Sequence, residues 1–243
     1  MRVQLSGRLK VDIGGHHATP ALRGMQGRAL LAYLILNRPR AIGREELVGA
    51  IWPQEPPTDA GAALRTQLSH LRAALGRESV VGRSAIELRL PDDTWVDVEA
   101  ADRAIEAAGE AMRGSSWRDA RDAARAALKV AEGPFLPGFA APWADQVRGE
   151  LAELELRCHE VIARAGIELG GSEVAVAERS ARTLIRLAPF RETGYMLLMR
   201  AQVASGKSAE ALRTYDELRR LLNAELGSAP GAEVQELHRE LLG

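Results

Sequence analysis

Two segments of the chain repeat one another at an offset of 34 residues, and this repeat constrains the fold more than any other feature. Small or apolar residues recur at matching places in residues 158–191 and 192–225, where Ala165, Ala177 and Leu184 correspond to Met199, Ala211 and Leu218. Small side chains at such positions let paired helices approach closely, and each pair then stacks on the next. The repeat predicts a helical solenoid of roughly three helix pairs.

Helical periodicity extends through the whole part of the chain after Asp97, where the signals for strands vanish. Pairs of residues that contain glycine or proline divide this part into helices, which we expect near residues 98–112, 116–132, 143–169, 173–187, 191–205, 208–225 and 231–242. A period of 34 residues is that of tetratricopeptide repeats. The match is partial, because Ala181 stands where an aromatic residue is usual. We predict an all-α, tetratricopeptide-like domain over residues 98–243.

The first 97 residues contain two pairs of predicted strands. Apolar residues occupy odd positions of residues 1–13, which predicts a hairpin that turns at Ser6-Gly7. Two further short strands are expected around Gly82-Arg83-Ser84. In the second of these, Ile86, Leu88 and Leu90 should face the core, with the charged side chains between them facing out.

Three helices are predicted between these strand pairs. The first two cover residues 25–37 and 43–52, and the third covers residues 62–76, with Thr58 or Asp59 as its N-cap. The order strand, strand, helix, helix, helix, hairpin is that of a winged helix-turn-helix. We therefore predict a mainly α fold, in which an N-terminal winged helix-turn-helix domain (α+β, residues 1–97) precedes the tetratricopeptide-like solenoid.

Composition narrows the classes of function. The net charge is −1, which argues against a protein that binds nucleic acid over its whole surface. Residues 1–97 carry 13 lysines and arginines against 10 acidic residues, whereas the rest of the chain carries 19 against 23. A mildly basic front part and an acidic rear part indicate two modules with different partners.

Several other classes of function lack the residues that they need. The single cysteine, Cys158, excludes an internal disulfide and a cysteine-based zinc finger. The histidines are scattered, and the sequence has neither a phosphate-binding loop nor a nucleophile elbow. We expect no enzyme, hence no catalytic residues, no metal and no cofactor. No stretch approaches eighteen apolar residues, so we expect no membrane partner and a cytoplasmic location.

The third helix of the first domain is the candidate recognition helix. Its leucines, at positions 64, 68, 71 and 75, occupy one side. The other side and the following turn carry a polar set: Arg65, Thr66, Ser69, His70, Arg72 and Arg77. Residues 60–77 contain no acidic residue, so nothing there repels phosphate. An ordinary solvated helix face stays open as the alternative, but these features favour DNA, since arginine can read guanine edges and threonine can touch a thymine methyl group.

Three more residues are weaker candidates for DNA contact. Trp52, which ends the second helix, either caps the core or donates its indole N–H to a phosphate. Arg83, at the tip of the second hairpin, and Arg89, on its outer face, suit a wing that enters the minor groove. Exposed arginines at turns are also common without such a role.

The chain resembles the actinobacterial SARP regulators, the AfsR/DnrI-like family. Residues 26–76, which include "QGRALLAYLILN" and "ALRTQLSHLRAALG", resemble the OmpR/PhoB-type winged helix of that family. The later segments "GPFLPGF" and "YDELRRLLNAELGSAPGAEVQELHRELL" resemble the bacterial transcriptional activator domain that follows it. The most specific part is "ELGSAPGAEVQELH". The likeness covers nearly the whole chain.

The resemblance implies a cytoplasmic transcriptional activator. Such proteins bind direct repeats in promoter double-stranded DNA as side-by-side dimers and recruit RNA polymerase holoenzyme, often at antibiotic and other secondary-metabolite genes. The residues of this chain that match DNA-facing positions of the family are Arg28, Trp52, Arg65, Thr66, Ser69, His70 and Arg72.

This chain departs from the family pattern in its charged residues. His70 stands where the family usually has arginine, Ala73 replaces a common second arginine, and Gln67 replaces a usual histidine. The usual Gly-Tyr of the wing is missing from "GRSAIELRL". Because each neutralised phosphate adds a counterion-release contribution, fewer fixed charges mean weaker attraction to DNA. The second hypothesis is therefore a degenerate winged helix that no longer binds DNA, with the solenoid acting as a protein–protein adaptor.

Overall fold

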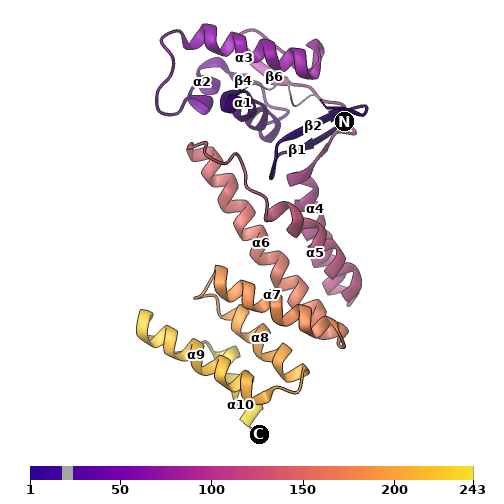
Figure 1. Cartoon of the computed structure of the whole chain (residues 1–243), viewed down its shortest axis with the longest axis vertical. Helices are drawn as coiled ribbons and strands as arrows, with labels where there is room; N and C mark the ends of the chain where they lie inside the picture. The colour runs from indigo at the N-terminus through magenta and orange to yellow at the C-terminus, as the bar shows by residue number, and fades with distance from the viewer. Residues whose placement is uncertain (18–23, 243) are drawn as a thin grey trace. The chain divides into compact units, whose positions relative to one another are not determined.

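The computed structural model describes residues 1–17 and 24–242. It divides into two compact units. Figure 1 shows the whole chain, coloured from its N-terminus to its C-terminus. The N-terminal unit comprises Met1–Ala100 and Val130–Leu151, and the C-terminal unit comprises Ala101–Lys129 and Ala152–Gly243. Residues 130–151 are thus grouped with the first hundred residues, although they lie well beyond residue 97. Among the described residues, no helix combines the length and the apolar character needed to cross a membrane.

A small sheet begins the N-terminal unit. Strand β1 (Arg2–Gln4) pairs antiparallel with β2 (Lys10–Ile13), so the predicted hairpin is confirmed. Gly7, in its turn, has a φ of 76°, a left-handed value that glycine adopts without strain. On one edge β2 pairs with β3 (His16–His17). On the other, β1 pairs in parallel with β7 (Trp95–Val96), a strand pairing that the sequence pattern did not predict.

The three predicted helices of this unit are confirmed as α1 (Gly24–Leu36), α2 (Arg44–Ile51) and α3 (Ala60–Leu75). A 3-10 turn, η2 (Arg77–Ser79), follows α3. A second sheet has the strand order β4-β6-β5, formed by Ile42–Gly43, Ala85–Leu88 and Val80–Val81. The β5–β6 hairpin is the wing. Ile86 and Leu88 are buried as predicted, whereas Leu90, beyond the end of β6, is only half-buried. The winged helix-turn-helix is therefore present.

All regular secondary structure in the described part of the chain after Val96 is helical. The helices are α4 (Asp97–Arg113), α5 (Trp117–Ala131), α6 (Pro142–Leu169), α7 (Glu173–Leu187), α8 (Glu192–Ala204), α9 (Ser208–Leu226) and α10 (Ala232–Leu242). Each predicted helix is confirmed to within one residue at either end. Among the residues described there, the one β contact is a single bridge between Phe135 and Ser6, within the N-terminal unit. The fold is mainly α, as predicted.

Small residues bring the helices of the repeat close together. Ala177 of α7 and Ala211 of α9 are both 0% exposed, as the 34-residue offset predicts. A Cβ atom on Gly194 of α8 would lie 3.2 Å from the Cβ of Leu184, so glycine permits the close packing of α8 on α7. One apolar cluster joins α6, α7 and α8, and the next joins α8, α9 and α10. This alternation is the packing expected of a tetratricopeptide-like solenoid.

A buried carboxylate ties α7 to the turn between α8 and α9. The side chain of Glu178 is 6% exposed, and its Oε1 accepts hydrogen bonds from Lys207 Nζ at 2.8 Å and Ser205 Oγ at 3.0 Å. Its Oε2 accepts from Arg182 at 2.9 Å. Burial alone disfavours the charge, but these hydrogen bonds outweigh it, and the pKa of Glu178 lies below its ordinary value.

Replacing Glu178 by glutamine is expected to destabilise the C-terminal unit by about 2 kcal/mol at neutral pH, because three bonds to a charged group are weakened. A depressed pKa stabilises the folded state above the unfolded pKa of about 4.3, and this contribution is lost as the pH falls through the folded pKa. Thermal melts at neutral and at acidic pH should therefore show a difference between wild type and variant that shrinks in acid. Glu168→Gln, at an exposed position of α6, is the matched control. A constant difference at all pH values would contradict the assignment.

Candidate nucleic-acid interface

Helix α3 is built to bury one side and present the other. Asp59 caps it, since its Oδ1 accepts a hydrogen bond from the N–H of Ala62 at 2.7 Å, which selects Asp59 from the two predicted caps. All four leucines of the stripe are buried. Helix α3 packs against α1, α2 and β5, and Figure 1 shows it along the outer side of its unit. Its remaining side faces solvent within the N-terminal unit.

The polar side of α3 is exposed as predicted for Arg65, Thr66 and Ser69, whereas His70 is half-buried. The guanidinium of Arg65 lies over the first turn of the helix, where a Cβ at Gly61 would be 3.6 Å from its Nη1. A side chain at position 61 would therefore be in ordinary van der Waals contact with this cation. The Thr66 hydroxyl donates to the carbonyl of Ala62 at 3.1 Å, so it is already paired.

Arg72 has a structural contact that the sequence did not predict. Its Nε donates to the carbonyl of Val80 at 2.9 Å, which ties α3 to the first strand of the wing. The side chain is half-buried, in contrast to the exposed Arg77 on η2. The role of Arg72 in holding a phosphate stays a prediction, and it would have to coexist with this contact.

The wing presents one exposed cation and one paired cation. Arg83 is exposed at the tip, and its carbonyl accepts a hydrogen bond from Arg44 of α2 at 2.8 Å. Arg89 faces outward as predicted, but it forms two hydrogen bonds with Glu87, at 2.8 and 3.2 Å. These hydrogen bonds raise the pKa of Arg89 and lower that of Glu87. A phosphate would have to compete with Glu87 for Arg89.

Two further predicted residues lie on the other helices. Arg28 is exposed on α1, and Trp52 is the half-buried C-cap residue of α2, whose backbone N–H donates to the carbonyl of Val48. Within the described residues, no ion pair involves Arg28, Arg65, Arg77 or Arg83. Among the residues that the structure describes, four exposed arginines from α1, α3, η2 and the wing thus have no acidic partner that would compete with an anion.

Sequence reasoning missed Arg44 as part of this region. An arginine in the first turn of a helix resembles any solvated residue, and only the fold shows that it reaches the tip of the wing. No local pattern could have identified it, because its partner, Arg83, lies 39 residues away along the chain.

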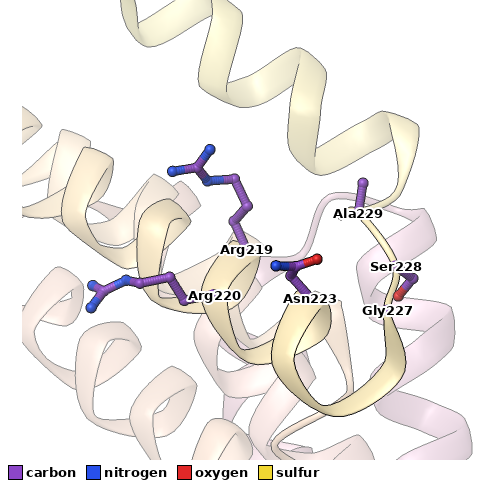
Figure 2. A pocket seen from close by; sticks show the side chains of 6 residues that line it. All are labelled: Arg219, Arg220, Asn223, Gly227, Ser228 and Ala229. Carbon is purple, nitrogen blue, oxygen red and sulfur yellow. The ribbon is translucent and has the colours of Figure 1, made fainter.

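The C-terminal unit has a surface hollow of a different kind. Figure 2 shows it at the end of α9, lined by Arg219, Arg220, Asn223, Gly227, Ser228 and Ala229. Arg219 forms an ion pair with Asp216 at 3.4 Å, and the Nε of Arg220 donates to the carbonyl of Asp216. Both cations are thus partly satisfied within their own helix.

Comparison with known proteins gives one family and several relatives. The family model described as "Bacterial transcriptional activator domain" matches residues 96–242. The regulatory protein AfsR of Streptomyces coelicolor is 37% identical over 225 residues, which cover 92% of this chain and 22% of AfsR. The transcriptional regulatory protein EmbR of Mycobacterium tuberculosis is 30% identical in an alignment 251 residues long. The alignment covers 98% of this chain and 62% of EmbR.

A solved structure shares the architecture. The structure of Mycobacterium tuberculosis EmbR in complex with a low-affinity phosphopeptide aligns with a TM-score of 0.86 and 26% sequence identity. The alignment covers 99% of this chain and 64% of that chain. This chain thus spans only part of the length of the relatives that it matches.

Proposed function

Because the chain belongs to the SARP family of transcriptional regulators, which carry the bacterial transcriptional activator domain, we propose that it is a DNA-binding transcriptional activator. The observation that carries the proposal is the exposed polar side of α3, which bears the exposed Arg65 and continues into the exposed Arg77. A helix of this kind fits the major groove, with its first turns toward the bases.

The exposed residues divide into two expected roles. Arg65, Thr66 and His70, with Ser69 between them, lie nearer the bases. Arg28, Trp52, Arg72 and Arg77 hold phosphates, and Arg83 with Arg89 follows the minor groove from the wing. The exposure of Arg28, Arg65, Arg77 and Arg83 supports this arrangement.

The remaining parts of the proposal rest on the family. The protein acts in the cytoplasm without catalysing a reaction and without a cofactor. Two protomers bind direct promoter repeats side by side, and residues 98–243 form the domain that recruits RNA polymerase holoenzyme. The regulatory names of AfsR and EmbR support a role in controlling transcription.

A second candidate function is a protein–protein adaptor with a degenerate winged helix. Two contacts favour it, since Glu87 neutralises Arg89 and the carbonyl of Val80 engages Arg72. The ion pair removes one cation from the set that can replace counterions on DNA, and the hydrogen bond holds the side chain of Arg72 toward the wing. The exposed hollow at the end of α9 would then be one place for a protein segment.

A binding titration of the purified chain decides between the two functions. We expect fluorescence anisotropy to show binding to duplexes from upstream of its own gene neighbourhood, with an affinity that falls steeply as salt rises. If no duplex shows salt-dependent binding, the adaptor function replaces the activator.

Two arginine variants test the division of roles. Arg77→Ala should weaken binding to all duplexes alike and reduce the salt slope by about one unit, because one phosphate contact is lost. Arg65→Ala should instead cost about 1–3 kcal/mol on the preferred duplex only, because a base contact is lost. Arg8→Ala, at an exposed position in the turn of the β1–β2 hairpin, is the control and should change neither quantity. Equal losses for all three variants would contradict the assigned roles.

A further inference from the structure

Trp143, at the start of α6, is surrounded by aromatic rings of the N-terminal unit. Its ring centroid lies 5.1 Å from that of Tyr33, 6.0 Å from Phe135 and 5.8 Å from Phe139. The first two pairs meet edge to face, an arrangement that the ring quadrupoles favour. The tryptophan thus packs against α1 through Tyr33.

The same tryptophan also caps α2. Its indole Nε1 donates a hydrogen bond to the carbonyl of Ala50 at 3.0 Å. Ala50 lies in the last turn of α2, where backbone carbonyls have no partner within the helix. Trp143 therefore satisfies one of these carbonyls and fixes the end of α2.

Tyr33 completes a connection between the two helices. Its hydroxyl donates to Glu46 Oε1 of α2 at 2.7 Å, and Arg40 donates to the same carboxylate at 2.6 Å. These hydrogen bonds lower the pKa of Glu46 to about 2, so the carboxylate stays charged. Since Trp143 contacts both Tyr33 and Ala50, it lies at the joint between α1 and α2.

The segment that carries Trp143 is itself held firmly. Arg148, one and a half turns further along α6, donates to the carbonyls of Phe135 at 3.0 Å, Leu136 at 2.8 Å and Phe139 at 2.6 Å. The Ser6 hydroxyl donates to the carbonyl of Val130 at 2.6 Å, which fastens the other end of the segment to the β1–β2 hairpin. Residues 130–151 therefore form a fixed support under α1 and α2.

From these contacts we infer that Trp143 is a positioning residue for the recognition helix. Helices α1 and α2 both pack on α3, so the joint that Trp143 holds sets the angle at which α3 meets DNA. The DNA-binding unit then includes residues 130–151, although the family model assigns them to the activator domain. This inference rests on the proposed function of α3.

The test compares Trp143→Ala with wild type in the full chain. Hydrogen exchange should rise about tenfold at the end of α2, because the carbonyl of Ala50 and the ring contacts of Tyr33 lose their partner. Affinity for the preferred duplex should fall about tenfold while the salt slope stays unchanged, because no charge is removed. Trp117→Ala, on α5 of the C-terminal unit, is the matched control and should leave exchange in α2 unchanged.

A second variant guards against general unfolding. Trp143→Phe keeps an aromatic ring but lacks the indole N–H, so it should keep a cooperative melt and still speed exchange at the end of α2. Wild-type exchange in α2 in this variant would overturn the inference. If wild type binds no duplex, the proposed function fails, and exchange in α2 and α3 still decides whether Trp143 positions them.

Discussion

Replacing Ala211 by arginine is expected to unfold the helices around α9, with a loss of about 4 kcal/mol or more. Ala211 is 0% exposed and lies in one apolar cluster with Met199, Tyr215 and Leu218. An arginine there would overfill the space and bury a cation without a partner. Circular dichroism during thermal unfolding should show an earlier transition and a reduced helical signal at the starting temperature.

Ala209 provides the control for this prediction. It lies two residues earlier in α9 but is exposed, so Ala209→Arg should stay within about 0.5 kcal/mol of wild type. A wild-type melting temperature for the Ala211 variant would show that the small residues of the repeat do not mark the crossing points of its helices.

Replacing Asp97 by alanine is expected to cost about 3–5 kcal/mol in the N-terminal unit. The carboxylate is 2% exposed and accepts hydrogen bonds from the backbone N–H groups of Leu5 at 2.8 Å, Ser6 at 2.9 Å and Val98 at 2.9 Å. Alanine would leave these buried donors without an acceptor, and the end of β1 would lose its link to α4. Urea unfolding of the full chain measures the loss.

Two further variants make this prediction specific. Asp92→Ala, at an exposed position five residues earlier, should have a small effect. Asp97→Asn keeps the shape but opposes an amide N–H to one of the backbone donors, so it should also destabilise. If asparagine is tolerated as well as aspartate, the second carboxylate oxygen is not needed by the N–H of Ser6 and the assignment is wrong.

Local patterns in the sequence were sufficient for the helices. The leucines of α3 are spaced so that one side of a helix is apolar, and Asp59 stands where a cap is needed, so both follow from neighbouring residues. The 34-residue offset is also visible in the sequence. Each repeat needs a small residue where its helices cross, so Ala177 and Ala211 stand 34 residues apart, and both are buried.

Contacts between residues far apart in the chain produced no pattern in the sequence from which they could be predicted. Strand β7 is two residues long, too short to show an alternating pattern, and it is fixed by parallel pairing with β1. The hydrogen bond from Arg72 to Val80 and the pair of Arg89 with Glu87 depend on how the wing folds back. The ion pair reduces the free charge of the candidate site and the hydrogen bond constrains the side chain of Arg72, and residue type alone could not reveal either contact.

The return of residues 130–151 to the N-terminal unit has a consequence for how the protein is made. The hydrogen bond between Ser6 and Val130 joins residues 124 positions apart, and that between Ala50 and Trp143 joins residues 93 apart. A ribosome that adds about 5–20 residues per second therefore needs several seconds to supply the support of α1 and α2 after these helices have emerged. In that interval α4 and α5 can form from local contacts, while the ring of Tyr33 and the end of α2 lack their contacts with Trp143. A stalled chain that ends before residue 130 would expose this apolar surface to chaperones and proteases.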